Sequence, residues 1–265
     1  MNIVVCVKQV PNTNEVKLDP KTGTLIREGV PSIMNPDDKA GLEAALELKD
    51  NTGAHITVVS MGPPQADAVL REAMAMGADD AYLVTDRAFG GADTLATSTT
   101  IAAALKKIGK TMKIDLIITG RQAIDGDTAQ VGPQIAEHLG IPNVSYAQDI
   151  KVDGDIVTVK RQFEDRYHVV KAKMPCLVTA LGDMNKPRYM TPGGIFDAYR
   201  ENEVKQITRK DLDVEDTQIG LKGSPTRVAQ SFPKQLKGKG TIVTPDGADA
   251  AADYIVARLE EKFII

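Results

Sequence analysis

The sequence predicts an α/β fold built on a doubly wound, mostly parallel β-sheet. Short apolar runs alternate with amphipathic stretches through about the first 140 residues. The runs lack the polar alternation of a strand with one wet face, which is typical of parallel strands buried on both sides. Regular alternation of strand and helix also implies right-handed crossovers between parallel neighbours. We therefore expect a Rossmann-like sheet with a helix in each crossover.

The elements follow one another in a regular order. β-branched or apolar runs predict parallel strands at residues 3–7, 56–61, 81–84 and 114–119. Apolar residues at helical spacing predict helices around residues 42–48, 68–76, 95–108 and 134–139. We expect Asp37 or Asp38 to cap the first helix and Asp93 the third, because a carboxylate accepts hydrogen bonds from first-turn amides.

The second half of the chain has a different pattern. Residues 149–161 predict a hairpin insertion that turns at Asp153-Gly154-Asp155, and residues 174–181 predict one more buried strand. Regularity fades from about Met190 until a final helix at 247–262. We expect residues 1–190 to form the nucleotide-binding domain and 191–265 an extended C-terminal arm that packs on a partner subunit.

Composition and charge exclude several classes of protein. The chain of 265 residues has no apolar run near the roughly 20 residues of a membrane span and no basic, signal-like N-terminus, so we expect a cytoplasmic protein without membrane association. Its net charge of −4 and lack of Trp disfavour nucleic acid as a partner. Cys6 and Cys176 lie in apolar runs and are expected to be buried thiols, and the three His residues lack metal-ligand spacing.

A polar, glycine-rich loop at residues 120–132 is the first candidate site. It joins a predicted buried strand to a predicted helix, which is where doubly wound sheets bind nucleotides. It matches neither a Walker loop nor GxGxxG, and a solvated loop of turn residues explains it almost as well. No catalytic constellation is evident. The candidate residues are Arg121, Gln122, Ala123, Ile124, Asp125, Gly126, Asp127, Thr128, Ala129, Gln130, Val131 and Gly132.

A second loop, at residues 86–97, also follows a strand and opens a helix. Its glycines and hydroxyls suit a second phosphate or polyol, although an ordinary capped loop is equally compatible. Loops of this kind meet at one edge of the sheet, and together they predict one adenine-nucleotide-binding crevice. The candidate residues here are Arg87, Phe89, Gly91, Asp93, Thr94 and Thr97.

Five segments in order resemble the β subunit of electron-transfer flavoproteins over essentially the whole chain. They are residues 7–10, 34–36, 73–79, 120–127 and 185–189. The resemblance implies a heterodimer with an α subunit that carries its own FAD. In ordinary members the β subunit binds AMP at positions that match Cys6, Asn35, Pro36, Asp37, Asp38, Met61 and the 121–132 loop.

The resemblance also implies a docking loop for an acyl-CoA dehydrogenase, which we expect to be a short-chain type. It falls on residues 181–189, with Met184 as a protruding apolar anchor. A partly buried loop methionine is the alternative. Its other matching residues are Asn185, Pro187, Arg188 and Tyr189.

The Gly-Gly-Ala-Asp-Thr sequence at 90–94 resembles the electron-bifurcating branch of this family. That resemblance implies FAD in place of AMP, NADH as hydride donor, and ferredoxin or flavodoxin as a further electron acceptor. Arg87 and Phe89 are then expected to line the NADH side. A non-bifurcating subunit with AMP and an adenine-nucleotide-sensing module are the alternatives.

Overall fold

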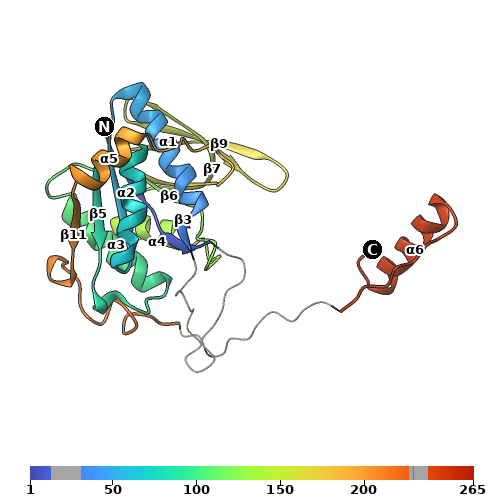
Figure 1. The fold of residues 1–265 in the computed structure, drawn as a ribbon. Helices are drawn as coiled ribbons and strands as arrows, with labels where there is room; N and C mark the ends of the chain where they lie inside the picture. The colour runs from blue at the N-terminus through green and yellow to red at the C-terminus, as the bar shows by residue number, and fades with distance from the viewer. Residues whose placement is uncertain (13–30, 227–228, 230–237) are drawn as a thin grey trace. The chain divides into compact units, whose positions relative to one another are not determined.

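The computed structural model describes residues 1–12, 31–226, 229 and 238–265. These form two compact units, Met1–Ala229 and Gln230–Ile265. The first unit contains the whole sheet and is coloured blue to orange in Figure 1. Among its described residues the second contains one helix, α6 (Ala248–Glu261), which matches the predicted final helix.

The predicted doubly wound fold is confirmed. The main sheet has nine strands in the order β11-β5-β4-β1-β6-β10-β7-β8-β9. All pairs from β11 to β7 are parallel, and β8 and β9 extend the sheet antiparallel. The parallel strands are β1 (Asn2–Cys6), β4 (His55–Met61), β5 (Asp80–Val84), β6 (Leu116–Gly120), β10 (Cys176–Ala180), β11 (Val204–Ile207) and the first part of β7 (Asn143–Asp153).

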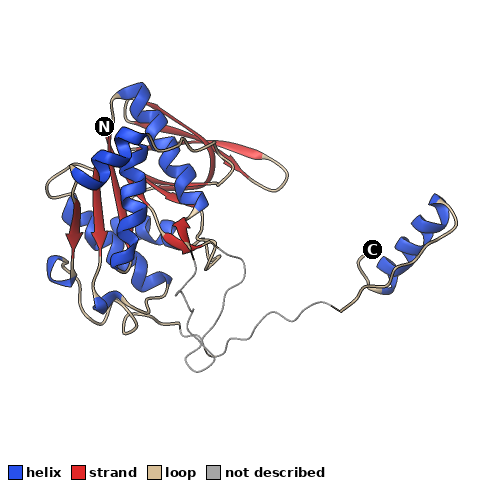
Figure 2. Ribbon diagram, viewed as in Figure 1, coloured by secondary structure: helices blue, strands red, loops and turns tan. Residues whose placement is uncertain are grey.

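Two apolar cores lie on opposite faces of the sheet, as alternation along β1 requires. Ile3 and Val5 contribute to one core, and Val4 and Cys6 contribute to the other. The first core also takes residues of α1 and α2, and the second takes residues of α3 and α4. Figure 2 shows this sheet between its helical layers. The helices are α1 (Pro36–Thr52), α2 (Asp67–Met76), α3 (Thr94–Ile108) and α4 (Val131–Leu139).

The hairpin insertion is confirmed and is larger than the sequence indicated. β7 and β8 (Ile156–Gln162) pair around a turn in which Gly154 adopts a left-handed φ of 58°. A third strand, β9 (Tyr167–Lys173), pairs with β8. It was missed because it is an edge strand whose mostly exposed residues carry little apolar signal.

Regular structure continues beyond Met190, where the sequence suggested that it fades. Helix α5 (Pro192–Arg200) opens with Pro-Gly-Gly, which is typical of a turn. Here the proline occupies the first turn, and the Thr191 hydroxyl caps the helix by accepting from the Gly194 amide at 3.0 Å. β11 then joins β5 in the main sheet, so the sheet extends past the domain boundary expected at residue 190. A small antiparallel pair, β2 (Gln9–Pro11) and β3 (Ser32–Met34), was also not predicted.

Both cysteines are free and buried, as predicted. Among the residues that the structure describes, no helix is long and apolar enough to cross a membrane.

Candidate functional site

A cavity of about 1400 Å³ opens at the carboxyl ends of the parallel strands. β1 lies between β4 and β6, so the chain leaves the centre of the sheet in opposite directions at this point. Such a switch point is where doubly wound sheets hold their ligands. The cavity is lined by the strand ends, by the beginnings of α3 and α4, and by the two loops that the sequence singled out.

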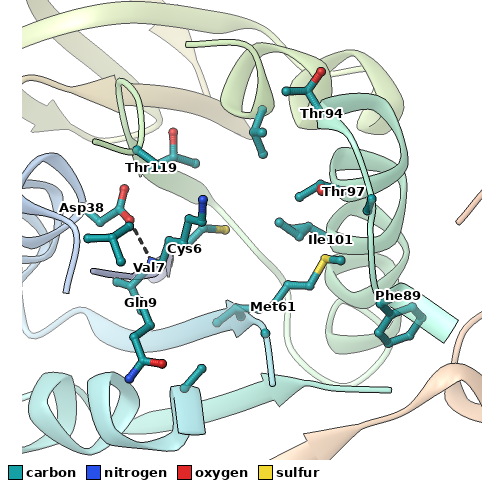
Figure 3. A pocket seen from close by; sticks show the side chains of 18 of the residues that line it. Cys6, Val7, Gln9, Asp38, Met61, Phe89, Thr94, Thr97, Ile101 and Thr119 are labelled. Carbon is teal, nitrogen blue, oxygen red and sulfur yellow. Dashed lines mark hydrogen bonds between the residues drawn. The ribbon is translucent and has the colours of Figure 1, made fainter. Parts of the chain in front are cut away.

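Figure 3 shows two facing walls of this cavity. Thr94, Thr97 and Ile101 project from α3 on one side, and Asp38 and Thr119 lie on the other. Cys6 and Met61 lie between them. Across the opening, the Thr94 hydroxyl donates a hydrogen bond to Gln130 Oε1 at 2.8 Å, so the two candidate loops are joined directly.

Asp38 joins the ends of the two central strands. Its carboxylate accepts from the Lys8 amide after β1 at 2.8 Å and from the Gly120 amide at the end of β6 at 2.9 Å. Burial raises the pKa of Asp38 to about 7, although these hydrogen bonds and one with Asn35 favour its charged form. A Cβ on Gly120 would also come within 2.7 Å of the Asp38 amide, so only glycine fits here.

The prediction that Asp37 or Asp38 caps the first helix is wrong. α1 begins at Pro36 with Asn35 in the N-cap position, and no side chain among the described residues caps it. Asp38 instead bonds the strand ends. Asp37 lies 3.4 Å from Arg121 (Oδ2 to Nε), and burial raises the pKa of Asp37 while the Arg121 charge opposes that shift.

Asn35 holds the 121–127 loop in place. Its side chain is fully buried, donates to the Gln122 carbonyl at 2.8 Å and accepts from the Ile124 amide at 3.1 Å. The loop is also tied to the segment after β1 by an ion pair between Lys8 Nζ and Asp125 at 2.7 Å. Asn35 and Asp125 therefore shape the site from behind the cavity wall.

The 121–132 loop has a strained and tightly packed end. Asp127 and Ala129 both adopt left-handed φ angles, of 49° and 52°, which few residues other than glycine adopt. A Cβ on Gly132 would lie 2.6 Å from Thr119 Oγ1, so α4 packs against β6 at a distance that only glycine allows. This approach brings the first turn of α4 to the cavity.

The second loop begins with a 3₁₀ turn, η2 (Arg87–Phe89), and ends at α3. Asp93 caps α3, as predicted, by accepting from the Ala96 amide at 3.1 Å. Phe89 lines the cavity but is only 5% exposed, because most of its ring packs in the second core. Arg87 lies at the rim and is exposed.

The structure brings most of the predicted residues together around one cavity. Those that line it are Cys6, Asp38, Met61, Arg87, Phe89, Gly91, Asp93, Thr94, Thr97, Arg121, Gln122, Ala123, Thr128, Ala129, Gln130, Val131 and Gly132. Those that do not contribute to its lining are Asn35, Pro36, Asp37, Ile124, Asp125, Gly126 and Asp127.

Sequence reasoning missed several lining residues. Lys8 and Gln9 follow β1, Thr119 is the penultimate residue of β6, and Ile101 lies one turn beyond Thr97 on α3. Position at a strand's carboxyl end is the signal that would have found the first three. Ile101 carries no such signal, because an apolar residue on a helix is ordinarily part of the core.

The 181–189 loop lies on α1. Asn185 donates to the Ala40 carbonyl at 3.0 Å, and Arg188 pairs with Glu43 and Asp50 at 2.9 and 2.8 Å. Hydrogen bonds to Glu43 and Asp50 raise the pKa of Arg188. Met184 is partly buried against the first core, whereas Tyr189 is 88% exposed. Of the two expectations for Met184, the structure therefore shows the partly buried loop methionine. Its role as an anchor for a partner stays a prediction.

Comparison with known proteins decides the family. A sequence model described as the Electron transfer flavoprotein domain matches residues 22–214. The chain belongs to the electron transfer flavoprotein family. It is 59% identical to the Electron transfer flavoprotein subunit beta of Clostridium acetobutylicum over 265 residues, the full length of both chains. We therefore describe it as a beta subunit of this family.

Two relatives carry more specific names. The chain is 54% identical to the Caffeyl-CoA reductase-Etf complex subunit CarD of Acetobacterium woodii over 266 residues. It is 48% identical to the Acryloyl-CoA reductase electron transfer subunit gamma of Anaerotignum propionicum over 271 residues. Both alignments cover the whole of each chain.

Proposed function

We propose that this beta subunit binds FAD in the switch-point cavity and takes part in electron bifurcation from NADH. The size of the cavity carries this proposal. Ligand pockets usually enclose roughly 300–1000 Å³, whereas this one encloses about 1400 Å³. AMP would occupy only the part beside the 121–132 loop. The space along α3 and the 86–94 loop then suits the second half of a flavin dinucleotide.

The residues beside α4 fit the adenosine and diphosphate. Val131 and Gly132 open this helix and line the cavity, and no side chain among the described residues caps it. Uncapped first-turn amides and the positive end of the helix dipole favour an anion. The N-terminus of α3 is less suitable, because the Asp93 carboxylate already caps it. We therefore place the diphosphate at α4.

The residues along α3 fit the remaining part of FAD. Thr94 and Thr97 offer hydroxyl groups on the cavity wall, which suit the polyol that joins the diphosphate to the flavin ring. Ile101 and Phe89 give an apolar surface farther along the same wall. Arg87 at the rim carries a positive charge that suits the phosphates of NADH.

When bound here, FAD would accept a hydride from NADH and pass single electrons to the flavin of an α subunit and to ferredoxin or flavodoxin. The chain's own part is to hold the cofactor in line and to set its polar surroundings. Two of the relatives are named as subunits of caffeyl-CoA and acryloyl-CoA reductase systems, which supports an acyl-CoA dehydrogenase as the other partner. We place this contact on residues 181–189 and the α-subunit contact on 191–265.

The chief alternative is a non-bifurcating subunit that binds AMP in the same cavity. A nucleotide-sensing module is disfavoured, because the family relatives align with the chain from end to end. The same residues beside α4 would hold AMP. The α3 wall is what separates the FAD proposal from this alternative.

The double variant Thr94→Val/Thr97→Val, purified with its α subunit, tests the proposal. Loss of the two hydroxyl groups should lower bound FAD from two toward one per heterodimer while AMP binding to the emptied site persists. Thr100→Val is the matched control, because Thr100 lies on α3 outside the cavity lining and its hydroxyl donates to the Ala96 carbonyl of the same helix at 2.8 Å. An unchanged content of two FAD in the double variant, or equal loss from both sites, contradicts the assignment of the α3 wall.

A further inference from the structure

The 86–94 loop is held from outside by a segment more than a hundred residues away in the sequence. We name residues 209–226 the clamp segment. The Arg209 amide donates to Asp86 Oδ2 at 3.1 Å, and the Leu221 amide donates to the Gly90 carbonyl at 3.1 Å. The start and the middle of the loop before α3 are therefore tied to this segment.

Asp93 is the centre of this attachment. Its amide donates to Ser224 Oγ at 2.8 Å, and its Oδ2 accepts from the Thr226 amide at 3.1 Å and the Thr226 hydroxyl at 2.8 Å. Oδ1 of the same carboxylate caps α3. Burial acts to raise the pKa of Asp93, but its hydrogen bonds, with those to the Ala96 and Thr226 amides among them, together lower this pKa and keep the carboxylate charged. One side chain thus connects the helix with the clamp segment.

The Ser224 hydroxyl makes hydrogen bonds to both the loop and the clamp segment. Ser224 is only 7% exposed, accepts from the Asp93 amide and donates to the Gly220 carbonyl at 2.8 Å. Gly220 has a left-handed φ of 55°, and a Cβ there would collide with the Ala88 carbonyl. A Cβ on Gly91, which has a φ of 73°, would meet the Leu221 side chain at an ordinary van der Waals distance. The backbone fit between loop and clamp is therefore close.

The two surfaces of the loop have different neighbours. Residues 89–94 line the cavity, while the clamp segment, among the described residues, contributes none of the lining. Any effect of the clamp on a ligand must therefore pass through the loop. The loop forms the wall of the cavity that AMP would not need.

We propose that Ser224 and Thr226 are positioning residues that fix the 86–94 loop as a cavity wall and thereby favour FAD over AMP. This inference rests on the proposed function. AMP beside α4 lies against the 121–132 loop, which Asn35 and the Lys8–Asp125 ion pair hold separately from the clamp. The hydrogen bond between Thr94 and Gln130 connects the two loops, so AMP should depend on the clamp much less than FAD does. FAD uses both walls and loses affinity when the second wall is released. The clamp segment then determines specificity without touching the ligand.

The experiment uses the heterodimer stripped of its cofactors and measures FAD and AMP binding to the β site by titration. Ser224→Ala removes the hydrogen bonds to the Asp93 amide and the Gly220 carbonyl and should weaken FAD at least roughly tenfold, while AMP affinity should stay within about twofold. Hydrogen exchange at the Asp93 amide should speed up in the same variant. Thr226→Val should act in the same direction, and Thr226→Ser, which keeps the hydroxyl, should restore binding. Thr111→Val is the control, since the Thr111 hydroxyl bonds Ile108 at the opposite end of α3.

Unchanged FAD affinity in both Ser224→Ala and Thr226→Val overturns the clamp proposal, and so does an equal loss of FAD and AMP. The wild-type heterodimer separates this failure from failure of the function. If wild type binds AMP and no second FAD, the proposed function is wrong and the inference is wrong with it. If wild type binds two FAD and the variants bind the β-site FAD with the same affinity, only the clamp proposal is wrong. Should Ser224→Ala fail to fold, the exposed Thr226 variants decide the question.

Discussion

Replacement of Asp38 by Asn should remove a specific part of the pH dependence of stability. Asp38 is buried, and its pKa is about 7 against an ordinary value of 3.8. A carboxyl whose pKa is raised by folding stabilises the native state at low pH, and that contribution is lost as the pH rises toward its folded pKa. Ionisation of Asp38 at neutral pH therefore destabilises the native state. The same carboxylate stabilises that state by joining β1 to β6 through its hydrogen bonds.

The magnitude follows from the shift. Between about pH 5.5 and about pH 7, unfolded Asp38 is ionised while the native side chain keeps its proton, so stability falls by roughly 1.4 kcal/mol per pH unit. The fall levels off above the folded pKa, which gives roughly 2 kcal/mol between about pH 5.5 and about pH 8. Asp38→Asn carries no charge and should lack this fall. It should be less stable at the lower pH, because its amide group faces a backbone donor where a carboxylate oxygen accepted.

Urea unfolding of both proteins at the two pH values, followed by circular dichroism, measures the difference. Asp153→Asn, in the exposed turn of the β7–β8 hairpin, is the control and should keep the wild-type pH dependence. If Asp38→Asn loses as much stability as wild type between the two pH values, the buried carboxyl is not the group that titrates, and the reasoning is refuted.

Three further predictions concern packing and charge. Gly120→Ala should destabilise the protein by roughly 2–3 kcal/mol and abolish nucleotide binding, because the new methyl group meets Asp38. In the control Gly126→Ala the new methyl group meets nothing within 4 Å, so the stability should change by less than about 1 kcal/mol. Equal effects of the two variants in urea unfolding would contradict this prediction. Arg188→Ala should cost roughly 2–4 kcal/mol, because it leaves the 5% exposed Glu43 without its partner; a loss below about 0.5 kcal/mol in the same assay would show that water replaces the pair. Cys6 should react with iodoacetamide at least about a hundredfold more slowly in the native than in the unfolded protein, because burial raises the pKa of its thiol to about 12. Comparable reaction rates of the two forms at pH about 8 would contradict this and would show that the thiol is open to solvent.

The sequence predicted the parts of the fold that local patterns determine. The parallel strands β1, β4, β5, β6 and β10 are apolar runs, and each was found within a few residues of its bounds. β9 and β11 were not found because both have exposed positions and depend on a neighbouring strand for their hydrogen bonds. Such strands carry little local signal.

In the site, too, the sequence predicted the features that depend on neighbouring residues and missed those that depend on residues far along the chain. Both candidate loops were found, because a polar loop after a buried strand is visible in the sequence. The role of Asp38 was not, since its partners at Lys8 and Gly120 lie 30 and 82 residues away. The same holds for Asp93, which was predicted as a cap and also bonds Thr226, 133 residues along the chain. Contacts of this kind follow from topology and are not encoded in any short motif.

The cofactor content of the purified heterodimer tests the central claim most directly. FAD and AMP are released by denaturation, separated by chromatography and counted against protein. The cavity of about 1400 Å³ with its two polar walls predicts two FAD and no AMP per heterodimer. One FAD together with one AMP would contradict the claim and would assign this beta subunit to the non-bifurcating type.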